Sequence, residues 1–359
     1  MTESIVVDPA KLRQFGDPMD SVFCLVTNPE YMDQISIVEN GGYRDYLKIP
    51  FKTGERFEEV LPDRVPEPAH VLAISPAAFF ESPMPEQLGP RRKLMGMACN
   101  STPTTMKTIK HFIDVMQRTS PEEQDAFSNG FFDKLERADH LVYVDERHGT
   151  RATLQHLQPG LVWNQQAGAL EWGEQQIVPS GEISVLPTQI VEFHEDLHLP
   201  IEGEICFRGY PILHSGTPSF SRRDQARLHS RLSSMNLHGV IATVEKGVIT
   251  SLRAHNSGAQ SAVDMLNTMF EVDSRYRIVW EMGHALNTSL DILPGNHAMN
   301  EVYGGTDGCL HWGLGLTPFT QYHLDIISPD TTVYTDTGEV VLGNPGGGPP
   351  DRLAVFPNS

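Results

Sequence analysis

The stretch Tyr322-His-Leu-Asp-Ile-Ile327 decides how the C-terminal half of this chain is interpreted. Its alternation of residue types predicts a β-strand, in which successive side chains point to opposite faces. His323 and Asp325 then share one face, while Leu324 and Ile326 pack into a core. An imidazole beside a carboxylate on a buried strand suits a zinc or transition-metal ion. Such an ion also offsets the cost of burying the charge.

Three further segments bring isolated polar side chains into glycine-rich, apolar sequence. In Trp280-Glu-Met-Gly-His284, Glu281 ends an apolar strand, and the glycine would let the backbone bend so that His284 enters the same cavity. His311 lies between apolar residues and glycines, and Glu182 begins a strand after a Ser-Gly turn. A single buried histidine is more often a hydrogen-bonded core residue than a ligand. Several such groups together favour a shared metal site.

A second polar cluster, Glu192-Phe-His-Glu-Asp-Leu-His198, competes with this interpretation. As a strand it would place Glu192, His194, Asp196 and His198 on one face. Because few apolar residues face the other way, a solvated edge or loop is the better interpretation. The sequence contains no GxSxG elbow, P-loop or HExxH motif, so these signatures of serine hydrolases, nucleotide-binding proteins and zinc proteases are missing.

Length and periodicity together predict two domains. A chain of 359 residues exceeds the usual size of one domain. In the first part, residues 69–75 predict a buried strand, and Ser120 followed by proline predicts a helix start. Short β-type segments with hairpin turns such as Lys246-Gly247 dominate afterwards. We therefore expect an α/β (α+β) fold, with an N-terminal α/β domain over residues 1–140 and a β-rich catalytic, metal-binding domain over residues 141–359.

The charge and the cysteines limit the partners and the compartment. A formal net charge of −19 argues against nucleic acid and anionic membranes, which need basic faces. A small-molecule or peptide substrate is expected instead. The four cysteines form no CxxC pair, the N-terminus lacks the pattern of a signal peptide, and no apolar run is long enough to cross a membrane. These features predict a cytoplasmic protein with reduced thiols.

At these residues the C-terminal half resembles the superfamily of aminopeptidase T and aminopeptidase S, which also includes 2,5-dihydroxypyridine dioxygenase. The resemblance rests on Pro179–Pro187, on the strand ending in Glu281, on the glycine-rich segment around His311 and on His323-Leu-Asp-Ile326. It covers residues 140–345 and implies a homodimer. It also implies a two-metal site whose ligands would be Glu182, Glu281, His311, His323 and Asp325.

This chain departs from the aminopeptidases of the family at one active-site position and in its shorter length, and three functions stay open. The aminopeptidases have an active-site tyrosine seven residues after the third ligand, where this chain has Pro318. The leading hypothesis is a hydrolase of an amide or related C–N bond with one or two zinc, manganese or cobalt ions. His284 or Tyr322 would then stabilise the oxyanion.

The alternative is a mononuclear Fe(II) dioxygenase that cleaves a hydroxylated aromatic or heteroaromatic ring. Two histidines and one carboxylate would bind the iron and leave positions open for substrate and oxygen. His284 or His297 could supply the additional imidazole. The third hypothesis is a non-catalytic relative with a binding role, suggested by the missing tyrosine.

Overall fold

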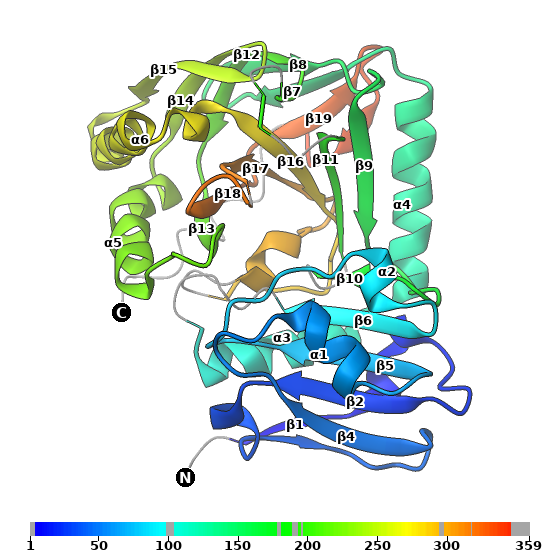
Figure 1. Cartoon of the computed structure of the whole chain (residues 1–359). Coiled ribbons are helices and arrows are strands. Elements are labelled where there is room, and N and C mark those ends of the chain that lie inside the picture. Colours follow the sequence, from blue (N-terminus) through cyan, green and yellow to red (C-terminus); the bar gives the residue numbers. More distant parts are fainter. Residues whose placement is uncertain are drawn as a thin grey trace.

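A computed structural model describes residues 4–97, 104–177, 181–188, 193–194, 197–293, 298–316 and 318–345. Figure 1 shows a parallel sheet from the N-terminal part of the chain at one end of the molecule and two larger, β-rich layers at the other. The fold is therefore α/β with a β-rich part, as the sequence predicts. Of the residues considered above, Glu192, Asp196 and His297 lie outside the described ranges.

The N-terminal sheet is parallel and has the strand order β10-β6-β5-β2-β4. Its inner strands are buried along their whole length, as expected when both faces of a parallel sheet are covered. The predicted strand at residues 69–75 is confirmed as β5. The strands are β2 (Val22–Thr27), β4 (Asp45–Pro50), β5 (Ala69–Ile74), β6 (Arg92–Met97) and β10 (Gln175–Gln176), beside a separate pair of β1 (Ile5–Val7) and β3 (Ile35–Ile37).

Helices cover this sheet and connect it to the rest of the chain. Ser120 caps the fourth helix as predicted, because its hydroxyl accepts a hydrogen bond from the Glu123 amide at 3.2 Å. None of the helices in the described ranges is both long and apolar enough to cross a membrane. The helices are α1 (Phe57–Arg64), α2 (Pro85–Leu88), α3 (Met106–Arg118), α4 (Pro121–Glu136), α5 (Arg222–Leu232) and α6 (Gln260–Val272).

Two antiparallel sheets form the β-rich part and enclose one large core between them. A six-stranded sheet has the order β13-β18-β17-β16-β11-β9, and a seven-stranded sheet has the order β15-β14-β12-β8-β7-β19-β20. Figure 1 places α4 at one side of this part and α5 and α6 at the other. The six strands are β9 (Leu161–Gln166), β11 (Glu182–Pro187), β13 (Tyr210–Ser215), β16 (Val279–Ala285), β17 (Cys309–Leu314) and β18 (Tyr322–Ser328). The seven are β7 (Leu141–Asp145), β8 (Thr150–Leu154), β12 (Ile201–Phe207), β14 (Val240–Glu245), β15 (Val248–Ala254), β19 (Thr332–Thr335) and β20 (Val340–Leu342).

The turn between β14 and β15 follows the predicted hairpin chemistry. Lys246 has φ 49° and Gly247 has φ 74°, the left-handed pair that a two-residue type I′ turn requires.

The N-terminal part and the β-rich part each contain a segment from the other half of the sequence. Strand β10 comes from the later half of the sequence but extends the N-terminal sheet, while Phe131 and Leu135 of α4 belong to the core of the β-rich part. The division at residue 140 stays a prediction.

Candidate metal centre

The five predicted ligands converge on one face of the six-stranded sheet. They come from four strands that are adjacent in the order β18-β17-β16-β11. Registers pair Gly283 with His311, and Gly313 with both Glu281 and Asp325. Neighbouring strands therefore present their polar side chains at the same level. The five residues are Glu182 on β11, Glu281 on β16, His311 on β17, and His323 and Asp325 on β18.

Asp325 stands at the middle of this cluster. Its Oδ1 lies 3.0 Å from His323 Nε2 and 4.0 Å from His311 Nε2. Each of these imidazoles also faces a glutamate at 3.2 Å: His323 faces Glu281, and His311 faces Glu182. A single carboxylate thus lies between two imidazole–glutamate pairs, an arrangement that suits a carboxylate bridging two metal ions.

The structure adds two residues to the cluster that sequence reasoning missed, His214 and Glu301. His214 is on β13 and is paired directly with His323 on β18. Its Nε2 lies 3.1 Å from Asp325 Oδ2 and 3.1 Å from Glu301 Oε2. Glu301 comes from a short 3-10 helix, Ala298–Val302. The sequence indicated His214 only as a histidine in an apolar run before Ser-Gly. Its pairing with His323 depends on the register of β13 against β18, which a short stretch of sequence does not reveal.

Two glycines leave the space that these side chains use. A Cβ on Gly283 would lie 1.9 Å from His311 Nε2 and 2.7 Å from Glu182 Oε1. A Cβ on Gly313 would lie 2.7 Å from the Cβ of Glu281 and 3.1 Å from Cε1 of His323. Any other residue at either position would push ligands apart.

Burial and unsatisfied polar atoms indicate that the cluster fits a cation. The exposed fraction is 1% for Glu182 and 0% for both His311 and Asp325. Within the described ranges, several atoms of the cluster have no partner in hydrogen-bond geometry, which is rare for buried polar groups. They are both carboxylate oxygens of Glu182 and of Asp325, Oε2 of Glu301, Nε2 of His214, and both ring nitrogens of His311. Metal ions satisfy such convergent nitrogen and carboxylate donors.

Burial and neighbouring charges shift the pKa values of the side chains in the cluster. Burial raises the pKa of the Glu182 carboxyl above its usual range. Burial alone would lower the pKa of His214, but the Glu301 and Asp325 carboxylates outweigh it and raise the pKa to about 9. His311 is raised in the same way by Glu182 against the effect of burial. The metal-free cluster therefore retains protons that a bound cation must displace.

His284 does not enter this cavity, contrary to the sequence-based expectation. Strand β16 continues through Gly283 to Ala285 without the expected bend, so its alternation puts Glu281 and His284 on opposite faces. His284 Nδ1 lies 3.0 Å from the Ile183 carbonyl oxygen, and its Nε2 lies 3.2 Å from the Tyr143 hydroxyl. Burial lowers the pKa of His284 to about 3, so it is a neutral core residue.

Tyr322 is also on the opposite face from His323 and Asp325. Its hydroxyl oxygen lies 3.2 Å from the Ser221 carbonyl oxygen and 3.2 Å from an Asp224 carboxylate oxygen, at the start of α5. The expected role of Tyr322 at the oxyanion therefore has no geometric support. Pro318, at the position of the family's tyrosine, is exposed.

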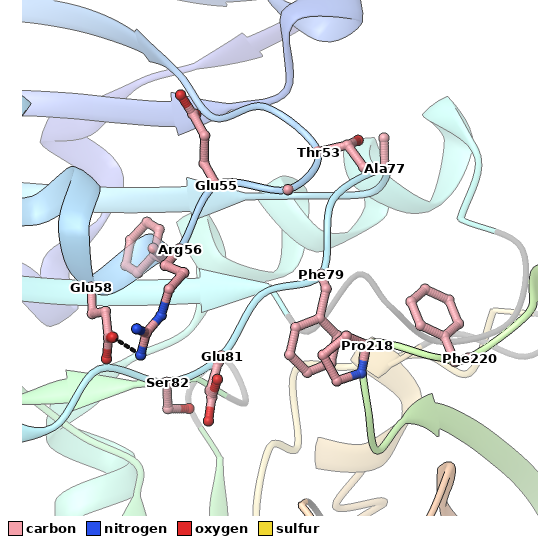
Figure 2. A pocket seen from close by; sticks show the side chains of 12 residues that line it. Thr53, Glu55, Arg56, Glu58, Ala77, Phe79, Glu81, Ser82, Pro218 and Phe220 are labelled. Carbon is pink, nitrogen blue, oxygen red and sulfur yellow. Dashed lines mark ion pairs between the residues drawn. The ribbon is translucent and has the colours of Figure 1, made fainter.

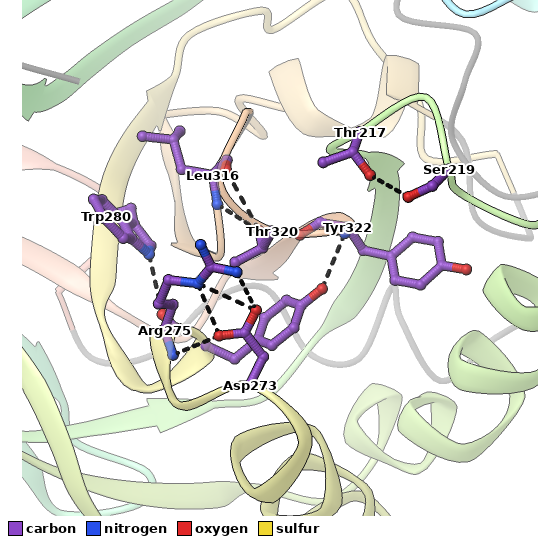
Figure 3. Close-up of polar contacts among 9 residues, drawn as sticks. Thr217, Ser219, Asp273, Arg275, Trp280, Leu316, Thr320 and Tyr322 are labelled. Carbon is purple, nitrogen blue, oxygen red and sulfur yellow. Dashed lines mark hydrogen bonds and ion pairs between the residues drawn. The ribbon is translucent and has the colours of Figure 1, made fainter. Parts of the chain in front are cut away.

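Hydrogen bonds between side chains and the backbone fix the hairpin that carries β18. The buried Thr320 hydroxyl accepts from the Leu316 amide at 2.9 Å and donates to the Tyr322 carbonyl at 2.7 Å. The Tyr322 amide donates to the Tyr276 hydroxyl at 2.9 Å (Figure 3). His323 Nδ1 in turn lies 2.5 Å from the Gly315 carbonyl oxygen, which directs its Nε2 toward the cluster.

A cavity of about 440 Å³ lies between the N-terminal sheet and the loop that follows β13. Phe79, Pro218 and Phe220 form an apolar wall, and Arg56 and Ser82 lie across from it (Figure 2). This volume is typical of small-ligand sites. The loop that carries Pro218 begins directly after the strand of His214, so it connects the cavity with the cluster along the chain.

Comparison with known proteins supports the fold. No protein-family model matches the chain, and no curated protein matches it by sequence. The solved structure of 2,5-dihydroxypyridine dioxygenase from Pseudomonas putida KT2440 is similar with a TM-score of 0.53 and 15% identity, covering 94% of each chain. Wild-type AmpT from Thermus thermophilus is similar with a TM-score of 0.43 and 12% identity, over 92% of this chain and 95% of AmpT. The chain therefore has the fold of the dioxygenase structure.

Proposed function

We propose that this protein is a metal-dependent hydrolase that cleaves an amide or related C–N bond of a peptide or a small specialised substrate. The observation that carries this proposal is the ligand count. Four carboxylates and three imidazoles form one connected cluster around Asp325. A mononuclear iron site needs only two histidines and one carboxylate. Two divalent cations, by contrast, would balance the four carboxylates.

The ligands divide into two sets around Asp325. His311 and Glu182 would hold one ion, and His323 and Glu281 the other, because each pair is 3.2 Å apart. Asp325 would bridge the two sets. The nitrogen and carboxylate donors suit zinc, manganese or cobalt. Bound metal ions would lower the pKa of water to roughly 7 and polarise the scissile carbonyl.

His214 and Glu301 would move the protons. Their Nε2 and Oε2 atoms are 3.1 Å apart, within reach for proton transfer. Glu301 would accept a proton from the attacking water, and His214 would carry one to the leaving amine. This pair replaces His284 and Tyr322, which both lie on the opposite face of the sheet.

The second candidate function is the Fe(II) ring-cleaving dioxygenase. It is favoured by one specific arrangement: His214 and His323 both face the Asp325 carboxylate, at 3.1 and 3.0 Å. Two imidazoles and one carboxylate form the donor set of non-haem oxygenases. The fold shared with the Pseudomonas putida dioxygenase is compatible with it.

Metal stoichiometry in matched variants tests the choice. Purified protein would be stripped with a chelator, reloaded anaerobically with zinc, manganese, cobalt or Fe(II), and analysed for metal. Aminoacyl anilides and hydroxypyridines would be supplied as substrates, with amine release and oxygen uptake as the two readouts. The hydrolase requires two ions per chain and amine release without oxygen uptake.

The variants Glu182→Gln and His214→Ala separate the two candidates further. In the hydrolase, Glu182→Gln reduces the metal content from two ions to one, whereas His214→Ala keeps both ions and slows turnover. In the dioxygenase, Glu182→Gln retains its iron and His214→Ala loses it. A wild-type protein that binds no metal at this cluster would refute both and leave the non-catalytic role. The homodimer stays a prediction, which sedimentation would measure.

A further inference from the structure

A second group of metal-binding side chains lies on the seven-stranded sheet, outside the cluster described above. Asp145 ends β7, and His148 lies in the turn between β7 and β8. Cys206 lies near the end of β12, and His255 follows the last residue of β15. Three segments that are distant in sequence thus bring a carboxylate, a thiol and two imidazoles to one end of the sheet.

The group is buried and closely packed. The exposed fraction is 1% for Cys206 and 2% for Asp145, and the side chain of His148 is 5% exposed. One donor atom from each of these three residues lies within 4.8 Å of the others. The exposed His255 packs its ring edge-on against His148, with 4.8 Å between the ring centroids.

Asp145 holds the imidazole of His148 in a defined orientation. One carboxylate oxygen accepts the His148 backbone N–H at 3.0 Å, and the other lies 2.8 Å from Nδ1. This leaves Nε2 of His148 as the nitrogen available to a ligand. A carboxylate that orients a histidine through its second nitrogen is the usual support of a zinc-bound imidazole.

A glycine lets the thiol and the imidazole approach the same stretch of backbone. A Cβ on Gly239 would lie 2.8 Å from Cys206 Sγ and 2.9 Å from His148 Nε2. Both donor atoms therefore face the region in front of this glycine. The His255 amide donates to the Gly239 carbonyl oxygen at 2.9 Å, which keeps the end of β15 beside that space.

We propose that Cys206 and His148 bind a zinc ion in front of Gly239, with Asp145 as the positioning residue and water at the remaining coordination positions. A mixed thiolate and imidazole set selects zinc over hard cations such as magnesium. The ion would tie the end of β12 to the β7–β8 turn, which indicates a structural role. This site is independent of the proposed hydrolase.

Binding requires the Cys206 thiol to release its proton to solvent, so that the thiolate forms the bond to zinc. Burial, followed by the nearby Asp145 and Asp330 carboxylates, raises the pKa of this thiol. Zinc affinity at the site should therefore increase with pH. The competing arrangement is a thiol that merely donates a hydrogen bond to Asp145 and binds no ion.

Cobalt titration of the full chain distinguishes the two arrangements. Co(II) bound to a thiolate produces an intense near-ultraviolet charge-transfer band, and none of the seven residues of the candidate metal centre contains sulfur. We expect this band in the wild-type protein, its loss in Cys206→Ser and its persistence in Cys24→Ser, which changes a buried cysteine of the N-terminal sheet. Cobalt bound without this band, or a band that survives in Cys206→Ser, would overturn the proposal.

A further pair of variants covers the case in which Cys206→Ser fails to fold. Asp325→Asn disrupts the candidate metal centre but leaves the second site intact, so it should retain the band and one tightly bound zinc. His148→Gln removes one nitrogen ligand and should weaken zinc binding at least tenfold, with unchanged near-ultraviolet circular dichroism. Equal zinc affinity in His148→Gln and wild type contradicts the site whether or not the hydrolase proposal holds.

Discussion

Gly283→Ala tests the geometry of the candidate metal centre without removing any ligand. The new methyl carbon would lie 1.9 Å from His311 Nε2 and 2.0 Å from its Cε1. Ordinary van der Waals contact begins near 3.4 Å, so the imidazole must move by about 1.5 Å. Metal–ligand bonds tolerate deviations of only about 0.2 Å. His311 would therefore cease to bind, and Glu182, 2.7 Å from the same carbon, would be displaced with it.

The expected result is a folded protein that has lost metal and activity. Because a side chain rather than backbone absorbs the clash, the free energy of unfolding should fall by only about 1–3 kcal/mol, the usual cost of overpacking a core. Metal content after reconstitution and equilibrium unfolding in urea measure the two effects separately. Gly130→Ala is the matched control, since nothing lies within 4 Å of its added carbon, and it should keep its metal and become slightly more stable.

The prediction fails if Gly283→Ala binds the same number of ions with wild-type affinity. That outcome would mean that His311 and Glu182 do not surround the metal. If Gly283→Ala does not fold, the His311 imidazole cannot move away from the added methyl group. Gly313→Ala then provides the same test from the other end of the cluster, because its added carbon meets Glu281 and His323.

Three further predictions follow from the protonation and the hydrogen bonds of the site. Metal affinity of the stripped protein should increase from about pH 7 to about pH 10, because His311, with a pKa raised to about 10, must release its proton to bind metal. Calorimetric titration at several pH values measures this, and a flat profile contradicts it. His284, with a pKa lowered to about 3, is neutral when folded but takes up a proton below about pH 6.5 when unfolded. It should therefore cost about 2 kcal/mol of stability at about pH 5, a loss that His284→Asn should lack in urea unfolding. Thr320→Val should destabilise the protein by about 1–3 kcal/mol, because it leaves the Leu316 amide without its acceptor; a Thr320→Ser variant that restores the hydroxyl should recover most of this.

Local patterns predicted much of the fold because their physical causes are local. The apolar run of residues 69–75 became β5, Ser120 caps α4, and Lys246-Gly247 forms the expected hairpin turn. The faces to which the side chains of β18 point were also predictable, because successive side chains of a strand alternate whichever strands it pairs with. His323 and Asp325 accordingly share a face.

The expectation that His284 enters the cavity of the candidate metal centre was wrong, and strand alternation again gives the reason. It assumed that the backbone bends at Gly283, whereas β16 stays extended to Ala285 and is paired on both sides by β11 and β17. Continuous pairing keeps the alternation, so a side chain three residues from Glu281 must face the other way. The glycine serves close approach of His311 rather than a bend.

By itself, the sequence determined which residue types could bind metal and which side chains share a face within one strand, because both depend only on residue type and on a period of two. Only the tertiary structure decided that His214 and Glu301 complete the cluster. His214 reaches it through the register of β13 against β18, and Glu301 reaches it from a 3-10 helix outside the sheet. Strand order and register are set by non-local packing of whole sheets, so no short stretch of sequence contains that information.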